Sequence, residues 1–191
     1  SDAVLQKLSD FAGDFVVSAA GPDMESVIAG KGSGAYEYSM KNNCVVANFD
    51  IGGGTTNIVV FDDGKTVARG CYDIGGRLIC IAPDMRVTKL SPSAARVAKT
   101  CGVCIRVGEK TKLEDLEKIA GKMTEVLCAV ISGTEDRQLL ALMEDLKTPG
   151  SSALDFDGKL DAVSFSGGVA EAIYEKKADA FEFGDIGIIL G

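Results

Sequence analysis

The chain has 191 residues, of which 46% are apolar and 25% are charged, the balance of an ordinary globular domain. Its net charge is −8, and no Lys/Arg cluster offers a surface for nucleic acid or for an anionic membrane. No apolar run approaches the roughly 20 residues that a membrane helix requires. We therefore expect a single domain that binds neither nucleic acid nor membrane.

The absence of histidine excludes Ser-His-Asp and Cys-His nucleophiles and His-ligated zinc. The six cysteines are spread through apolar segments, which is typical of reduced thiols in the cytoplasm. Cys101 and Cys104 form a CxxC, but no second pair completes a zinc site, so we interpret both as thiols without a functional role. No basic-then-apolar leader opens the sequence, and we expect no secretory route.

The first part of the chain is expected to alternate between helix and strand. Apolar residues at helical spacing predict a helix over 4–11, and a short strand follows at 15–17. Pro22 then opens a second helix that should end at Gly30. Residues 31–43 contain Gly, Ser and Asn and are expected to form a connection.

Three strands are expected next, over 45–51, 57–61 and 66–72. The first two are joined by a Gly-Gly-Gly-Thr-Thr segment, and the last two by residues 62–65, whose Asp-Gly pair favours a tight hairpin. These strands therefore predict an antiparallel meander.

The remainder of the chain is expected to be mainly helical. Ser91 and Pro92 mark the start of one helix, and a capping box at Thr111 and Glu114 marks the start of the longest one. The expected segments are helices at 92–101, 113–131 and 139–146, a surface loop at 147–160, a strand at 162–165, and helices at 169–174 and 186–190. The order indicates a mixed α/β lobe.

The strongest functional signal is a glycine-rich turn between two buried strands. Three glycines remove every Cβ, so that backbone N–H groups can converge on a phosphate. Two threonine hydroxyls can donate to the same oxygens. The predicted nucleotide-binding residues of this turn are Gly52, Gly53, Gly54, Thr55, Thr56 and Asn57.

Asp50 ends the strand that enters this turn. Mg²⁺ keeps most of its water shell and needs few carboxylates when phosphate supplies other ligands. We therefore predict Asp50 as the catalytic carboxylate that holds Mg²⁺ through water. A plain hairpin turn would need two residues and no buried acid, which favours a nucleotide site over a structural turn.

Two further glycine pairs follow predicted strands. Gly75, Gly76 and Arg77 would let the backbone approach a ligand, with the guanidinium reaching a phosphate. A second set, Gly167, Gly168 and Val169, opens a helix and could pack against an adenosine, although a tight strand-to-helix turn explains it equally well.

Two of these segments resemble known motifs. Asp50 to Asn57 is similar to a phosphate motif of the actin/Hsp70/sugar-kinase superfamily, and Ser166 to Ala170 is similar to its adenosine motif. Nearly the whole chain also resembles the EutA family of ethanolamine utilisation proteins. That wider resemblance lies in residues 13–17, 20–22, 25–30, 75–78, 166–169 and 185–187.

The resemblance implies the fold and the cofactors. It implies an α/β, ribonuclease H-like lobe of an actin/Hsp70-type ATPase, with a mixed sheet, antiparallel hairpins and flanking helices. ATP and Mg²⁺ are the implied cofactors. The superfamily's N-terminal phosphate motif is absent, so we expect residues 1–191 to form one nucleotide-binding lobe of a larger two-lobed protein. ATPase activity is expected of the full-length protein, and little or none of this lobe alone.

The resemblance also implies a function and a partner. It implies a chaperone-like, ATP-dependent reactivating factor for adenosylcobalamin-dependent ethanolamine ammonia-lyase. Such a factor promotes the exchange of damaged cobalamin. Ethanolamine ammonia-lyase and ATP/ADP are thus the implied partners. The implied roles are Mg²⁺ ordering by Asp50, phosphate binding by residues 52–56, cleft lining by residues 75–77 and adenosine contact by residues 167–169.

Two other functions remain open from the sequence. One is a small-metabolite kinase of the same superfamily, and the other is an actin-like filament or microcompartment-associated protein. The oligomeric state and any association with a microcompartment also remain open. Asp185 is ambiguous, because it could contact a nucleotide or only cap the terminal helix.

Overall fold

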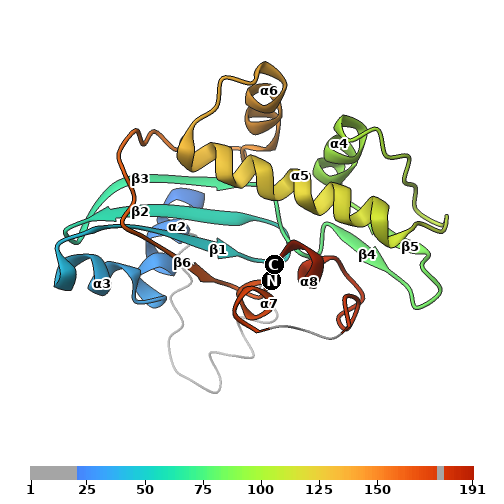
Figure 1. Ribbon diagram of the computed structural model, residues 1–191, viewed down its shortest axis with the longest axis horizontal. Coiled ribbons are helices and arrows are strands. Elements are labelled where there is room, and N and C mark those ends of the chain that lie inside the picture. Colours follow the sequence, from blue (N-terminus) through green and yellow to red (C-terminus); the bar gives the residue numbers. More distant parts are fainter. Residues whose placement is uncertain (1–20, 176–178) are drawn as a thin grey trace, which may run out of the picture.

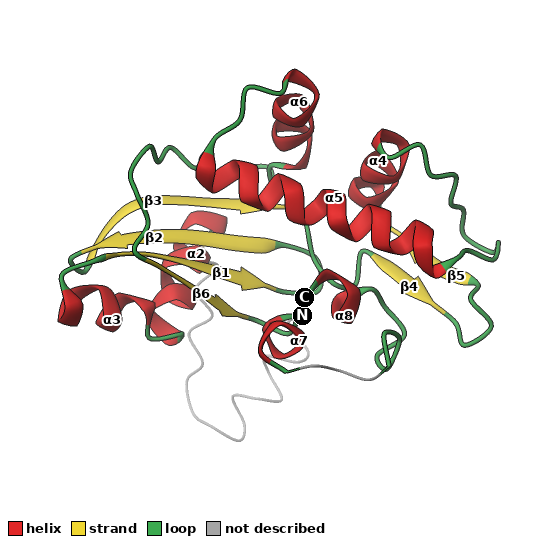
Figure 2. Cartoon of the chain, viewed as in Figure 1, coloured by secondary structure: helices red, strands yellow, loops and turns green. Residues whose placement is uncertain are grey.

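The computed structural model describes residues 21–175 and 179–191, so the helix and strand expected at 4–11 and 15–17 lie outside the described residues. Figures 1 and 2 show a sheet with helices on both faces. The elements are α2 (Pro22–Gly32), α3 (Ala35–Asn42), β1 (Val45–Ile51), β2 (Thr56–Asp62), β3 (Lys65–Tyr72), β4 (Ile79–Ile81), β5 (Val87–Leu90), α4 (Pro92–Thr100), α5 (Leu113–Ser132), α6 (Arg137–Leu146), β6 (Ala162–Ser166), α7 (Ala170–Tyr174) and α8 (Gly187–Leu190).

The central sheet has the strand order β3-β2-β1-β6. The meander β1-β2-β3 is antiparallel, as predicted, and β6 pairs with β1 in parallel. The sheet is therefore mixed, and β1, β3 and β6 all run in the same direction. Their carboxyl ends consequently meet at one edge of the sheet.

The predicted hairpin joins β2 to β3 at the opposite edge. Asp63 and Gly64 both have positive φ, 46° and 72°, as a two-residue turn of type I′ requires. The Gly64 N–H donates to Ser39 Oγ at 3.2 Å. The turn is thus fixed against α3 as well as by its own backbone.

Each face of the sheet packs against its own helices. Phe49, Ile58 and their neighbours face α5 in the main core, whereas Val59 and Phe61 face α2 and α3 in a smaller one. Successive side chains of a strand point to opposite faces, so one continuous apolar run serves both cores. Helix α2 approaches β2 at Gly30, where an added Cβ would lie 2.7 Å from Phe61 Cε2.

The expected connection over 31–43 is wrong, because α2 continues to Gly32 and α3 follows at Ala35–Asn42. The buried side of α3 consists of small or polar residues, Ala35 and Ser39, and carries no stripe of large apolar side chains. The Ser39 hydroxyl donates to the Cys44 carbonyl at 2.6 Å. A helix held this way lacks the hydrophobic periodicity that sequence analysis detects.

The capping box at Thr111 is also wrong. Helix α5 begins one residue later, with Lys112 at its N-cap and no capping side chain. The Thr111 N–H instead donates to the Met85 carbonyl at 2.9 Å, beside the unpredicted two-stranded sheet β4-β5. No helix of the described residues is long and apolar enough to cross a membrane.

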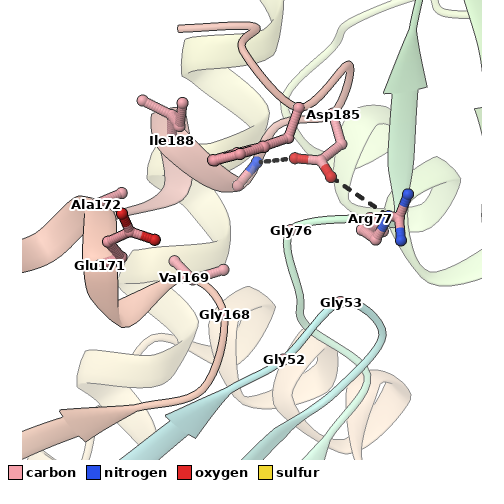
Figure 3. A pocket seen from close by; sticks show the side chains of 12 residues that line it. Gly52, Gly53, Gly76, Arg77, Gly168, Val169, Glu171, Ala172, Asp185 and Ile188 are labelled. Carbon is pink, nitrogen blue, oxygen red and sulfur yellow. Dashed lines mark hydrogen bonds and ion pairs between the residues drawn. The ribbon is translucent and has the colours of Figure 1, made fainter. Parts of the chain in front are cut away.

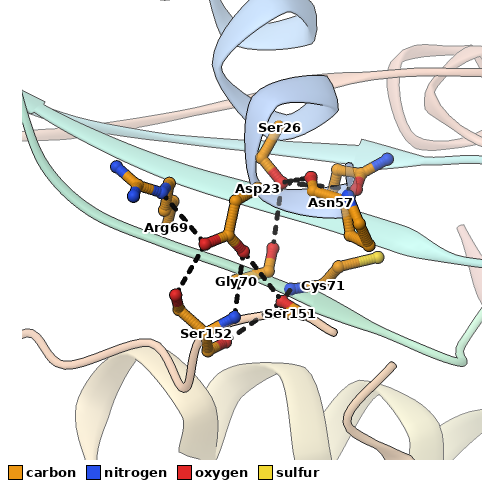
Figure 4. A network of polar contacts seen from close by, with 9 residues as sticks. Asp23, Ser26, Asn57, Arg69, Gly70, Cys71, Ser151 and Ser152 are labelled. Carbon is orange, nitrogen blue, oxygen red and sulfur yellow. Dashed lines mark hydrogen bonds and ion pairs between the residues drawn. The ribbon is translucent and has the colours of Figure 1, made fainter. Parts of the chain in front are cut away.

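A polar network fastens the first turn of α2 to β3 and to the loop after α6 (Figure 4). The Asp23 carboxylate accepts hydrogen bonds from the Ser152 N–H at 2.9 Å and from the Ser152 hydroxyl at 2.6 Å. Ser151 Oγ and Arg69 Nε complete its contacts at 3.2 and 3.1 Å. Burial alone would raise the pKa of Asp23, but these hydrogen bonds, led by those from Ser152, hold it below its ordinary value.

This network predicts a pH-dependent contribution to stability. The folded pKa of Asp23 is depressed, so its carboxylate stabilises the protein above the unfolded pKa of about 4, and this stabilisation is lost as pH falls through the folded pKa. We expect Asp23→Asn to lower the free energy of unfolding at pH 7, and this difference from the wild type to shrink as the pH is lowered below about 4, in urea denaturation. Asp62→Asn, at an exposed position, is the control. A loss that stays the same as the pH falls would contradict the role of the charge.

Candidate functional site

The three parallel strands β1, β3 and β6 each lead toward a glycine pair at the same edge of the sheet. Gly52 and Gly53 follow β1, Gly75 and Gly76 follow β3, and Gly167 and Gly168 follow β6. Ligands of open α/β sheets bind outside the carboxyl ends of the strands. This edge is therefore where a ligand site is expected on physical grounds.

A cavity of about 430 Å³ lies at this edge (Figure 3). The turns after the three strands form one side of it, and α7 with the segment before α8 forms the other. The residues that line it are Gly52, Gly53, Gly76, Arg77, Gly168, Val169, Glu171, Ala172, Phe183, Asp185, Gly187 and Ile188. Six of these, Gly52, Gly53, Gly76, Arg77, Gly168 and Val169, were predicted from the sequence.

The turn after β3 lies directly on the turn after β1. The Gly76 N–H donates to the Gly52 carbonyl at 3.0 Å, and the Arg77 N–H donates to the Gly53 carbonyl at 2.7 Å. A Cβ added at Gly75 would lie 2.7 Å from the carbonyl oxygens of both Gly52 and Gly53. Only glycine permits this approach, so Gly75 serves the construction of the site without lining the cavity.

The turn after β6 is fixed to β1 in a similar way. Gly167 has φ 84°, and an added Cβ there would lie 2.5 Å from the Ile51 carbonyl oxygen. The Val169 N–H donates to that same oxygen at 3.1 Å. All three turns are thus held together by backbone contacts around the end of β1.

Gly54 and Gly168 differ from the other predicted glycines. A Cβ added at either would have nothing within 4 Å, and neither has positive φ. Among the described residues, no hydrogen bond uses the N–H of Gly53, Gly54 or Gly168. Gly168 lines the cavity and Gly54 lies one residue beyond the lining glycine Gly53, so open space adjoins the main chain at both positions.

The segment before α8 closes the far side of the cavity. The Ile186 N–H donates to the Gly76 carbonyl at 3.1 Å, and an added Cβ at Gly76 would lie 2.7 Å from Gly187 Cα. The Asp185 carboxylate accepts from the Gly187 N–H at 2.8 Å and pairs with Arg77 Nε at 3.5 Å. Asp185 therefore both accepts from the first N–H of α8 and lines the cavity.

Asp50 lies at the end of β1, beside the cavity lining. It is half-buried, and its Oδ1 accepts a hydrogen bond from the Ser166 hydroxyl of β6 at 2.8 Å. Thr55, two residues beyond the lining glycines, is half-buried in the same turn. Asp50 and Thr55 thus lie outside the cavity lining, each two residues from a glycine that belongs to it.

Thr56 and Asn57 point away from the cavity. The Thr56 hydroxyl is fully buried and donates to the Ile74 carbonyl at 2.8 Å, which fixes the chain after β3. Asn57 lies on the other face of β2, where its Oδ1 accepts from Ser26 Oγ of α2 at 3.2 Å. In this structure both side chains stabilise the turn through hydrogen bonds on the side away from the cavity.

Sequence reasoning missed several lining residues. Glu171 and Ala172 follow Val169 within α7, so extending the third motif by one helical turn would have included them. Phe183 and Ile188 had no local signal, because they reach the cavity through contacts distant in sequence. Phe183 exposes 54% of its surface beside the cavity.

The lining suits a nucleotide with a divalent cation. Backbone N–H groups and the Arg77 guanidinium can bind phosphate. Val169, Ala172 and Ile188 form an apolar part of the cavity wall. Among the described residues, no group of three or more Cys, Asp or Glu side chains could hold a metal alone. A single carboxylate such as Asp50 suits Mg²⁺ that arrives with phosphate.

Comparison with known proteins identifies the family. The family described as ethanolamine utilisation protein EutA matches residues 1–191. The chain belongs to the EutA family. The ethanolamine ammonia-lyase reactivase EutA of Escherichia coli (strain K12) is 36% identical over 183 residues, which are 96% of this chain and 38% of that protein.

A second EutA-family relative gives the same picture. The ethanolamine ammonia-lyase reactivase EutA of Salmonella typhimurium (strain LT2) is 35% identical over 183 residues, with the same shares of both chains. The chain thus spans 38% of the length of the curated EutA relatives it matches. No solved structure matches the chain significantly.

The two kinds of glycine in this EutA-family site predict opposite effects on stability. Gly75→Ala places a Cβ against backbone that cannot yield without shifting the turn, so we expect a loss of about 1–3 kcal/mol in the free energy of unfolding. Gly168→Ala meets open space and should change it by less than about 0.5 kcal/mol. Urea denaturation of both variants measures the difference. Equal stabilities would contradict the backbone packing described for Gly75.

Proposed function

We propose that the full-length protein is an ATP-dependent reactivating factor for ethanolamine ammonia-lyase, acting in ethanolamine utilisation. Membership of the EutA family and the names of the two curated relatives support this role. The observation that carries the ATP-dependent part is the convergence of three glycine turns on one cavity, where the N–H groups of Gly53 and Gly168 make no hydrogen bond with the described residues. The cobalamin itself belongs to the lyase.

The proposed binding mode assigns each part of the lining a task. The N–H groups of Gly53 and Gly54 and the Arg77 guanidinium bind phosphate oxygens, and the Gly168 turn with Val169 contacts the nucleoside. Arg77 is 70% exposed although it pairs with Asp185, so it can turn to a phosphate at little cost. Asp50 holds the water shell of Mg²⁺, whose charge neutralises that of the phosphates.

The fold proposed for the lobe follows from the same features. A mixed sheet with a glycine hairpin at its carboxyl edge supports the actin/Hsp70-type ATPase lobe. The curated relatives are much longer than this chain, so we propose that the rest of the protein supplies the second lobe and the other side of the nucleotide cleft. This lobe alone should then bind ATP weakly and hydrolyse little of it.

The proposed cycle couples nucleotide state to the lyase. Nucleotide binding stabilises one arrangement of the two lobes, because it contacts both, and its loss on hydrolysis favours another. The change alters the contact with ethanolamine ammonia-lyase, so that damaged cobalamin leaves and adenosylcobalamin enters. ADP is the product that must then be exchanged.

The decisive experiment uses the full-length protein and ethanolamine ammonia-lyase blocked by an inactive cobalamin. We expect lyase activity to return after addition of ATP, Mg²⁺ and adenosylcobalamin, and to depend on each of them. Asp50→Ala should reduce recovery at least tenfold, which corresponds to about 1.4 kcal/mol, because the cation loses its carboxylate. Asp62→Ala, the same change at the exposed end of β2, is the matched control.

Two results would contradict the proposal. Recovery without ATP would remove the nucleotide from the mechanism, and undiminished recovery with Asp50→Ala would remove the carboxylate from it. Tight ATP binding with no recovery of the lyase would instead separate the nucleotide site from the proposed partner.

A further inference from the structure

A chain of four polar side chains crosses from β6 to β1 beside the cavity. The Ser164 hydroxyl donates to Asn48 Oδ1 at 2.9 Å, and Asn48 Nδ2 donates to Ser166 Oγ at 3.1 Å. The Ser166 hydroxyl then donates to Asp50 Oδ1 at 2.8 Å. These side chains share the sheet face that packs against α2 and α3, because they alternate in step with Val46 and Ala162.

The charge of Asp50 sets the direction of every bond in this chain. An ionised carboxylate only accepts, so the Ser166 hydroxyl must give its proton to Asp50 and can only accept from Asn48. The Asn48 amide must then present its NH₂ group to Ser166 and its oxygen to Ser164. Donors and acceptors are therefore aligned from Ser164 to Asp50, and only the Ser166 hydroxyl contacts the carboxylate.

The partly buried position of these four hydrogen-bonded side chains costs free energy of folding unless it serves a function. Asn48 is fully buried, next to Val46 and Val59, which are apolar and also buried. A buried amide stabilises the fold only where all its hydrogen bonds are made, and an apolar residue of similar size would avoid that requirement. No buried side-chain nitrogen or oxygen of the described residues lacks a partner, so this chain is complete.

We propose that Ser166 and Asn48 are positioning residues that orient the Asp50 carboxylate for a divalent cation bound with nucleotide. Ser166 occupies Oδ1, while Oδ2 accepts no hydrogen bond from the described residues. The carboxylate is thereby held in one rotamer with a free oxygen for a water ligand of the cation. This inference rests on the proposed nucleotide site.

The same contact connects two parts of the site. Ser166 directly precedes the Gly167-Gly168 turn, and Asp50 lies two residues before the Gly52-Gly53 turn. A shift of the β6 turn moves the hydroxyl that orients the carboxylate. Cation binding at the end of β1 and nucleoside binding after β6 are thus coupled through one hydrogen bond.

The test compares two serines of the same strand in the full-length protein. Ser166→Ala removes the hydrogen bond to Asp50. Ser164→Ala removes the same group from the same face of β6 but leaves that bond in place. Binding of a fluorescent ATP analogue is titrated with Mg²⁺ and also measured in EDTA, and thermal unfolding confirms that each variant is folded.

We expect Ser166→Ala to raise the Mg²⁺ concentration for half-maximal binding about tenfold, the usual cost of losing an outer-shell partner. Its affinity for the analogue in EDTA should match that of the wild type, and Ser166→Thr, which keeps the hydroxyl, should restore the Mg²⁺ dependence. Ser164→Ala should remain within about twofold of the wild type, because one neutral hydrogen bond at a distance from the carboxylate contributes little.

Other outcomes separate this inference from the proposed function. If Ser166→Ala weakens binding equally with Mg²⁺ and in EDTA, its role is structural and the inference is overturned. An unchanged Mg²⁺ dependence in Ser166→Ala overturns it as well, while leaving the nucleotide site in place. A wild-type protein that binds no analogue under either condition overturns the proposed nucleotide site, and the inference with it.

Discussion

The construction of the site depends on the contact between two turns of bare backbone. The chain after β3 can lie on the chain after β1 only because Gly75 has no side chain, and the two hydrogen bonds from Gly76 and Arg77 then fix their separation. This contact places Arg77 at the cavity and presents the Gly76 carbonyl to Ile186. The segment before α8 is thereby held in place, although it lies more than a hundred residues away in sequence.

Polar side chains stabilise the arrangement that these backbone contacts create. Thr56 fixes the chain after β3 from the interior, and Asn57 joins β2 to α2 through Ser26. In the first turn of the same helix, Asp23 fastens α2 to the loop that follows α6. These contacts fix α2 against the sheet and thereby stabilise the positions of the strands relative to one another.

The sequence predicted the features that depend on local patterns. Continuous apolar strands and the Asp63-Gly64 turn define the meander, and Ser91 and Pro92 begin α4 through local chemistry. The pattern failed for α3, whose buried residues are small or polar, and for β4 and β5, which are short and pair with each other and with loop residues. Phe183, Ile188 and the turned-away Asn57 depend on contacts distant in sequence, which periodicity cannot reveal.

The main-chain character of the cavity has an evolutionary consequence. At the three turns, the surface offered to a ligand is largely peptide backbone, which is the same in every protein. Selection on ligand affinity here would act less on the identity of side chains than on their absence at a few positions. Strand and helix residues around the turns are then free to diverge, and distant sequences can retain the same binding surface while their outer faces adapt to new partners.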